Sequence, residues 1–244
     1  MRLLFFALLS LAPFAASAVD YPQEIGKATA RSFPYSMIGQ VLYKSGGSFL
    51  STGTVINTTS VLTAGHALYD PDTGWSTEVL FRRSNYGSTW LDQQYARRIY
   101  VLAGYQAAAD DSGPSSSAAF AKDLGGMTFR RAVGGGGKAG WTADPPLLSG
   151  SAYNIALGYG AETHSGDQLL FVEPEFAFFR SYAAFYENDS IAIEPGMSGG
   201  PVFARRNDRL YVAAVIVSGS EDPVGGGVRA LNGKAADFIE TYLP

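Results

Sequence analysis

The sequence contains no cysteine in its 244 residues. This absence excludes a small domain held together by disulfides, an enzyme with a catalytic thiol and a zinc site with cysteine ligands. The stability of the chain must therefore come from packing. Hydrophobic residues make up 46% of the chain, which is ample for a sizeable core.

Clusters of positive charge are also missing. Charged residues make up 16% of the chain, the net charge is −4, the isoelectric point is near 5.2, and no run of lysine or arginine occurs. These features argue against nucleic acid as the main partner. The short acidic turn Asp70-Pro71-Asp72 is too small to indicate a calcium site. We expect neither a metal nor a cofactor.

Long apolar runs are absent except near the N-terminus. Arg2 precedes a mostly apolar stretch from residue 3 to 14, and Ala16-Ser17-Ala18 is a pattern that signal peptidase accepts. The stretch is shorter than the roughly 20 residues that a helix needs to cross a bilayer. We interpret residues 1–18 as a signal peptide and expect a secreted protein, extracellular or periplasmic, without membrane contact after its removal.

Glycine and tyrosine, by contrast, are abundant, with 29 and 14 residues. Short runs of branched and aromatic residues are separated by Gly, Asn and Ser, a pattern typical of β-hairpins and Greek keys. The pattern predicts strands at residues 37–43, 49–56, 60–63, 78–81, 98–102, 152–159, 169–172, 176–179 and 210–217. Over residues 234–243 the apolar positions are spaced by three and four, which predicts an amphipathic terminal helix.

Two segments rich in small residues interrupt this pattern. We expect residues 107–119 to form an exposed loop, and residues 134–140, with four consecutive glycines, to join two β units. The predicted organisation is a polar leader or short propeptide over residues 19–32, an N-terminal β-barrel over residues 33–133, and a C-terminal β-barrel with the helix over residues 134–244.

Ser198 has the surroundings of an acyl-transfer nucleophile. It lies in Pro195-Gly196-Met197-Ser198-Gly199-Gly200-Pro201-Val202, where glycines on both sides allow a tight turn that exposes the hydroxyl. The segment also matches G-x-S-x-G, the nucleophile elbow of the α/β-hydrolases. In that fold the catalytic histidine follows the serine, whereas both histidines of this chain, His66 and His164, precede Ser198. The α/β-hydrolase interpretation is therefore rejected.

A base upstream of Ser198 is required, and His66 has a suitable context. It ends Val61-Leu62-Thr63-Ala64-Gly65-His66, a β-run that closes in small residues and places the imidazole at the end of a strand. A side chain at the end of a strand can be held in a fixed orientation by the strand and still be accessible to a substrate. His164 lies in a polar turn, and we interpret it as a solvated residue.

The two segments V-L-T-A-G-H and G-M-S-G-G-P-V-F together resemble the trypsin/chymotrypsin-like serine protease superfamily. The cysteine-free form is most similar to bacterial glutamyl-endopeptidase-like members. The resemblance implies an all-β fold of two six-stranded Greek-key β-barrels (chymotrypsin-like) with a C-terminal α-helix, and a secreted serine endopeptidase that hydrolyses proteins or peptides. We expect a monomer. Two alternatives remain open: an inactive homologue that binds peptide or carbohydrate, and a structural or adhesive β-protein.

The third catalytic residue implied by the resemblance is Asp123. It begins Asp123-Leu124-Gly125-Gly126-Met127-Thr128-Phe129, which resembles the strand that the acid of the family opens. Asp110 and Asp111 are rival candidates, but they lie in the expected loop. Since the acid that orients the histidine must be held rigidly and shielded from water, we prefer Asp123.

The resemblance also implies where a substrate binds. The backbone N–H groups of Gly196 and Ser198 form the oxyanion hole. The substrate pocket is lined by residues shortly before Ser198 and by a strand after it, namely Ala192, Ile193, Val217, Ser218 and Gly219.

Two residues near this pocket, Met197 and Val217, depart from the family pattern, and a third, Glu194, bears on specificity. Met197 stands where trypsin-type zymogens carry an aspartate that pairs with a newly freed N-terminus, so that activation switch cannot operate here. Val217 stands roughly where glutamyl endopeptidases carry a histidine, which argues against glutamate specificity. Glu194 either disfavours acidic substrates or is a solvated loop residue, and we interpret it as the latter.

Overall fold

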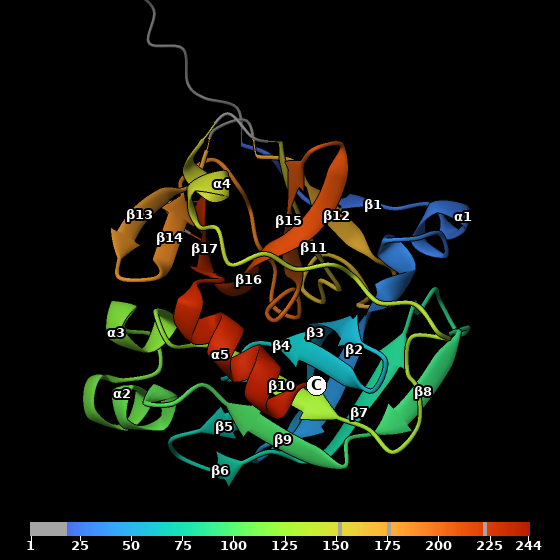
Figure 1. The fold of residues 1–244 in the computed structure, drawn as a ribbon, viewed down its shortest axis with the longest axis horizontal. Helices are drawn as coiled ribbons and strands as arrows, with labels where there is room; N and C mark the ends of the chain where they lie inside the picture. Colours follow the sequence, from blue (N-terminus) through green and yellow to red (C-terminus); the bar gives the residue numbers. More distant parts are fainter. Residues whose placement is uncertain (1–18, 151–152, 175–176, 222–223) are drawn as a thin grey trace, which may run out of the picture.

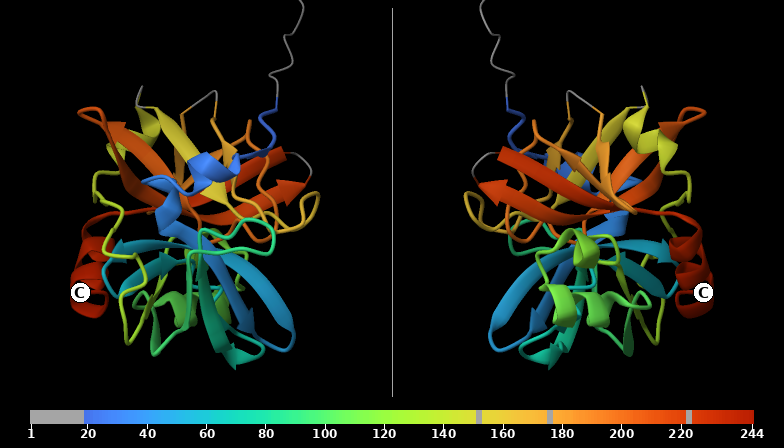
Figure 2. Two further views of the ribbon diagram at one scale, coloured as in Figure 1. Left: turned by 90° about the vertical axis from the view of Figure 1, so that its right-hand side faces the viewer. Right: turned by 90° about the vertical axis from the view of Figure 1, so that its left-hand side faces the viewer.

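The computed structural model describes residues 19–150, 153–174, 177–221 and 224–244. The chain forms two curled β-sheets, one above the other in Figure 1, and the side views of Figure 2 show the same arrangement. The predicted signal peptide lies outside the described residues. Within the described ranges, no helix is both long enough and apolar enough to cross a membrane.

The first sheet has the strand order β8-β7-β2-β3-β4-β10-β9. Its strands are β2 (Ile38–Lys44), β3 (Ser48–Asn57), β4 (Ser60–Thr63), β7 (Thr77–Arg83), β8 (Asp92–Tyr95), β9 (Arg98–Val101) and β10 (Gly125–Thr128). Inward-facing residues such as Val41, Val55 and Phe81 are buried and form its core. A two-stranded ribbon, β5 (Tyr69–Asp70) and β6 (Gly74–Trp75), lies between β4 and β7 in the chain.

The second sheet has the strand order β1-β12-β11-β15-β16-β17-β14-β13. Its strands are β1 (Gln23–Glu24), β11 (Asn154–Gly158), β12 (Leu170–Val172), β13 (Phe179–Tyr182), β14 (Phe185–Asn188), β15 (Pro201–Arg206), β16 (Arg209–Glu221) and β17 (Val224–Ala230). The prediction for residues 176–179 is therefore displaced, because β13 begins only at Phe179, and residue 176 lies outside the described ranges.

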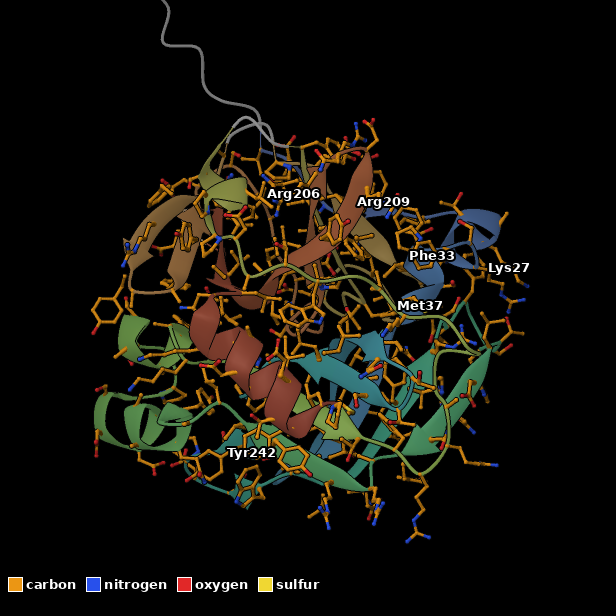
Figure 3. All side chains as sticks on the ribbon, viewed as in Figure 1. Lys27, Phe33, Met37, Arg206, Arg209 and Tyr242 are labelled. Carbon is orange, nitrogen blue, oxygen red and sulfur yellow. The ribbon has the colours of Figure 1, made fainter. Side chains whose placement is uncertain are left out.

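The segment that we expected to be a leader is joined to the second sheet. β1 pairs with Leu170 and Phe171 of β12, and Ile25, only 6% exposed, enters the core. The chain continues through α1 (Lys27–Ala30) and η1 (Tyr35–Met37) to β2. Figure 3 shows this path from Lys27 past Phe33 to the buried Met37.

The expected loop at residues 107–119 is largely helical, so that prediction is wrong. α2 (Tyr105–Ser112) and α3 (Ser117–Phe120) pack together, and Tyr105, Ala108, Ala109 and Ala119 form a small buried cluster. The alanines supply an apolar face that the neighbouring acidic, serine and glycine residues concealed in the sequence. Ser116 caps α3 by accepting a hydrogen bond from the Ala119 N–H.

The terminal helix α5 (Gly233–Tyr242) lies against the first sheet, although it follows the last strand of the second (Figures 1 and 3). The rings of Tyr242 and Tyr100 are 5.1 Å apart, and the Ser60 hydroxyl donates to the Pro244 carbonyl at 3.2 Å. A Cβ on Gly126 of β10 would lie 2.5 Å from the Leu243 side chain. The helix therefore fastens the end of the chain onto the first sheet.

The predicted all-β class with a C-terminal helix is confirmed. Among the described residues, the sheets contain seven and eight strands instead of six each, because short edge strands such as β1 and β8 extend them. A helix α4 (Pro146–Ser149) precedes β11 and was not expected. The division of the chain into the four predicted segments stays a prediction.

Candidate active site

Asp123 holds His66 at two points. One carboxylate oxygen, Oδ2, lies 2.6 Å from Nδ1 of the His66 ring, and the other, Oδ1, accepts the His66 backbone N–H at 2.9 Å. Asp123 is fully buried, whereas the His66 side chain is 29% exposed. The arrangement fixes the ring position and leaves its other nitrogen, Nε2, without a role in this contact.

Strand ends of the first sheet bring these two residues together. His66 follows β4 and Asp123 precedes β10, and the two strands pair antiparallel with Gly125 opposite Thr63. A Cβ on Gly65 would lie 3.0 Å from Asp123 Oδ1, so only a small residue fits there. The close approach of Gly65 to the Asp123 carboxylate thus explains the glycine before His66 in the A-G-H ending of the motif.

The rival acids are placed elsewhere. Asp110 lies on α2, where its carboxylate accepts the Tyr69 hydroxyl at 3.1 Å, and Asp111 is exposed beside it. Neither carboxylate is hydrogen-bonded to His66. Of the three candidate acids, the structure brings only Asp123 to the histidine.

Ser198 lies on a tight turn between β14 and β15, within residues 194–200, which we call the nucleophile turn. Gly196 and Gly199 have φ values of 94° and 82°, which side chains other than glycine rarely adopt. A Cβ on Gly196 would lie 2.4 Å from the Tyr159 carbonyl oxygen, and one on Gly199 would lie 2.1 Å from the Thr52 carbonyl oxygen. The glycines around Ser198 are therefore required by both angle and space.

Two backbone N–H groups of this turn are left free. Within the described ranges, those of Gly196 and Ser198 donate to no protein acceptor, whereas those of Met197, Gly199 and Gly200 each donate to a carbonyl. Free N–H groups beside a nucleophile are what an oxyanion hole requires.

The first sheet holds the nucleophile turn through Ser51 and Thr52 of β3. The Thr52 hydroxyl donates to the Gly196 carbonyl at 2.8 Å and accepts the Tyr159 N–H at 2.9 Å. The Thr52 N–H and the Ser51 hydroxyl both donate to the Ser198 carbonyl, at 2.7 and 2.5 Å. Neither Ser51 nor Thr52 was expected at the site from the sequence. The available signal was the three hydroxyl residues Ser51, Thr52 and Thr54, close together in a mostly apolar strand.

The electrostatics of the site favour a charged imidazole. Burial lowers the pKa of His66, but the negative charge of Asp123 and the hydrogen bond to it outweigh burial, and the pKa lies above 6.5. Burial, with smaller contributions from Asp123 and Asp70, raises the pKa of Tyr43 to about 12. Tyr43 also lines the cleft and is neutral over the physiological range.

His66 and Ser198 line one cleft of about 440 Å³. Four of the five predicted pocket residues line it as well, namely Ile193, Val217, Ser218 and Gly219. Ala192 does not line the cleft; its backbone N–H donates to the Asp20 carbonyl at 3.0 Å. The cleft thus joins both sheets, since His66 comes from the first and the pocket residues come from the second.

Glu194 and His164, interpreted from the sequence as solvated, are paired. Their carboxylate Oε1 and ring Nδ1 lie 2.7 Å apart, and the side chains are only 7% and 24% exposed. The interpretation of Glu194 was wrong, and His164 is only partly exposed, because the turn at His164 folds back onto the nucleophile turn. That contact joins residues 30 positions apart, and no local pattern indicates it.

Comparison with solved structures identifies the architecture. The chain superposes on a Glu endopeptidase with a TM-score of 0.70 and 19% identity, covering 92% of this chain and 96% of the other. It superposes on the protease Anisep from Arthrobacter nicotinovorans with a TM-score of 0.69 and 17% identity, covering 84% and 94%. The chain has the chymotrypsin-like fold. The fold expected from the resemblance is thereby confirmed, and no family model matches the chain.

A further match of this chymotrypsin-like chain is the "Extracellular metalloprotease" of Bacillus subtilis (strain 168). The two are 23% identical over 230 residues, which are 91% of this chain and 68% of that protein. In the part of the chain that the structure describes, no group of three or more His, Cys, Asp or Glu side chains could hold a metal ion. His66 and His164 each pair with one carboxylate instead. The described residues therefore do not fit a protein-held metal centre.

Proposed function

We propose that the protein is a secreted serine endopeptidase, with Ser198 as nucleophile, His66 as general base and Asp123 as the acid that orients the base. The observation that carries this proposal is the double hold of the buried Asp123 on His66, beside the cleft that His66 shares with Ser198. An acid, a base and a Gly-flanked hydroxyl at one cleft are the components of acyl-transfer catalysis.

The proposed reaction proceeds as follows. The hydroxyl oxygen of Ser198 attacks the carbonyl carbon of the scissile peptide bond, and its proton passes to Nε2 of His66. The C–N bond then breaks as His66 returns this proton to the leaving amine, which yields an acyl-enzyme. Water hydrolyses the ester by the same route, with the proton finally restored to Ser198. Asp123 accepts the Nδ1–H throughout and stabilises the imidazolium.

The oxyanion of each tetrahedral intermediate is proposed to bind the N–H groups of Gly196 and Ser198. Their freedom from protein acceptors supports this role, since a donor already in use would have to break a bond first. One such donor contributes about 3 kcal/mol to transition-state stabilisation.

We propose that the pocket binds an uncharged substrate side chain, in a cleft that Asp70, Glu162 and Glu194 also line. Ile193 and Val217 are apolar, and a Cβ on Gly219 would lie 2.5 Å from the Ile193 carbonyl oxygen, so the two walls approach closely. A substrate carboxylate would find no histidine at Val217. We therefore propose cleavage after small or medium apolar residues, in proteins or peptides encountered outside the cell.

A fluorophosphonate probe tests this function directly, because it reacts only with an activated serine. The protein purified without its signal peptide is treated with the probe, and the labelled peptide is identified by mass spectrometry. We expect one adduct, on Ser198, together with hydrolysis of denatured casein. Ser198→Ala should lose both, and His66→Ala should lose nearly all of both. A folded wild-type protein that neither reacts nor hydrolyses is an inactive homologue, and the proposal then fails.

A further inference from the structure

We propose that Glu194 is a positioning residue: its carboxylate fastens the nucleophile turn to residues 160–166, which we call the anchor loop, and so keeps the oxyanion hole assembled. This inference rests on the proposed peptidase function. It assigns a role to Glu194, Thr163 and His164, three residues that the triad mechanism does not use.

Both carboxylate oxygens of Glu194 have hydrogen-bond partners in the anchor loop. Its Oε1 accepts the Thr163 hydroxyl and lies 2.7 Å from the His164 ring Nδ1. Its Oε2 accepts the backbone N–H groups of Glu162 and Thr163 at 3.4 and 3.3 Å. The Glu194 residue is only 6% exposed, and its charge requires such donors because a buried unpaired charge is strongly destabilising.

The protonation state of Glu194 agrees with this. Burial by itself raises the pKa of its carboxyl group. The hydrogen bonds from Thr163 and His164, the charge of His164 and the backbone of Glu162 outweigh burial, and the pKa lies below 4.5. Glu194 is therefore an anion wherever the proposed enzyme works, and all its contacts in the anchor loop are charge-assisted.

Backbone hydrogen bonds connect this carboxylate to the oxyanion hole. The Glu194 carbonyl accepts the Met197 N–H at 3.0 Å, which closes the turn around Gly196. The Pro195 carbonyl accepts the Ala161 N–H at 2.8 Å, a second bond between the turn and the anchor loop. Glu194 therefore stands at the start of the turn, with its main chain inside the turn and its side chain in the loop.

The anchor loop is itself held by the first sheet. The buried Gln40 side chain of β2 donates to the Gly166 carbonyl at 2.6 Å. A Cβ on Gly160 would lie 2.5 Å from Glu194 Oε2, which shows how closely the loop and the turn approach. A continuous set of contacts therefore runs from β2 through the loop to the free N–H groups of Gly196 and Ser198.

Met197 supplies no charge to this turn. It is fully buried in an apolar cluster and cannot form an ion pair with an N-terminus. In proteases of the trypsin type such a pair orders this turn. Here Glu194 lies three residues further upstream and takes its partners from the anchor loop, so the turn is held without a cleaved terminus.

The test compares Glu194→Ala with Glu78→Ala, which removes a surface ion pair of the same 2.7 Å length between Glu78 and Lys44. Melting temperature, kcat and KM for a peptide amide, and affinity for a peptide boronate are measured. We expect Glu194→Ala to remain folded, to lose about 100-fold in kcat with KM nearly unchanged, and to bind the boronate proportionally less tightly. Glu78→Ala should match the wild type in all three.

Two further variants keep the proposal testable if Glu194→Ala fails to fold. Thr163→Val keeps the Glu194 charge and loses one donor, so we expect a smaller fall in kcat at unchanged KM, and Thr163→Ser should restore it. Full kcat in a folded Glu194→Ala protein, or in Thr163→Val, overturns the positioning role while the peptidase function stands. A wild-type protein without hydrolysis or fluorophosphonate labelling overturns both, so the two failures are distinguishable.

Discussion

The hydroxyl of Thr52 lies 2.8 Å from the carbonyl oxygen of Gly196 and joins the two sheets at the nucleophile. Thr52 is fully buried on β3, and the same hydroxyl accepts the Tyr159 N–H at 2.9 Å. One side chain of the first sheet thus satisfies two backbone groups of the second. The relative position of His66 and Ser198 depends on contacts of this kind, because each residue belongs to a different sheet.

Replacement of Thr52 by valine should therefore destabilise the protein. Thr52→Val preserves volume but leaves the Gly196 carbonyl and the Tyr159 N–H without a partner, and a buried unpaired group costs about 1–3 kcal/mol. We expect the free energy of unfolding in urea to fall by about 2 kcal/mol or more. Thr54→Val on the same strand is the matched control, since the buried Thr54 hydroxyl has no partner and its loss should be neutral. Equal effects of the two variants would contradict the cross-link.

Asp123→Asn should reduce kcat by about 10⁴-fold at an intact melting temperature, because an amide can donate to Nδ1 and favour the wrong tautomer of His66. Asp110→Asn, on the exposed face of α2, is the control and should be close to wild type. Steady-state kinetics on a chromogenic peptide amide decide the matter. If Asp110→Asn is the inactive variant, the acid has been assigned to the wrong residue.

Activity should rise with pH through a pKa above 6.5. His66 must be neutral to accept the serine proton, and Asp123 holds its pKa above the ordinary value. The acid limb of a kcat/KM profile reports this pKa in the free enzyme. In Asp123→Asn the limb should move to lower pH, because the raising charge is gone and burial remains. An acid limb below 6.5 in the wild type contradicts the ion pair.

The same shift predicts a small effect on stability. The pKa of His66 is higher in the folded state than in the unfolded state, so its pairing with Asp123 adds to the free energy of unfolding. This stabilisation is fully present below about pH 6.5, the unfolded pKa, and is lost as pH rises through the folded pKa. Urea unfolding of wild type and His66→Gln across this window measures the difference. If the free energies of unfolding of wild type and His66→Gln differ by the same amount at every pH in this window, the ion pair contributes nothing to stability.

Chelation should leave peptide hydrolysis unchanged. The described residues contain no group of three or more His, Cys, Asp or Glu side chains that could hold a metal ion, although a sequence relative is named a metalloprotease. The rate is measured after dialysis against EDTA and again after addition of Zn²⁺ or Ca²⁺. Loss of activity in EDTA with recovery on adding either ion would require a metal-dependent account.

Removal of residues 19–31 should lower stability more than activity. The sequence alone indicated a leader or short propeptide over residues 19–32, whereas the structure pairs β1 with β12 and buries Ile25. Loss of the Ile25 side chain alone is expected to cost about 2 kcal/mol. A variant starting at Ser32 should melt several degrees below one starting at Val19, by calorimetry, and still hydrolyse peptide at low temperature. Identical melting curves would mark the segment as a dispensable leader.

The sequence by itself determined the features that depend on local chemistry. The short runs of branched and aromatic residues indicated the strands, and the glycines around Ser198 indicated a turn because few other residues adopt its angles. The small residues before His66 reflected the lack of space beside Asp123. These properties depend on neighbours along the chain or on a single close approach, and they leave a trace in residue type.

Tertiary structure alone decided the features that join distant segments. The pairing of Glu194 with His164, the hold of Thr52 on Gly196 and the packing of α5 on the first sheet connect residues 30 or more positions apart. Glu194 and His164 looked solvated because polar residues in turns usually are, and their burial follows only from how the anchor loop folds back. A charged group can be buried wherever the fold supplies its donors, and no sequence pattern near Glu194 identifies the donors in advance.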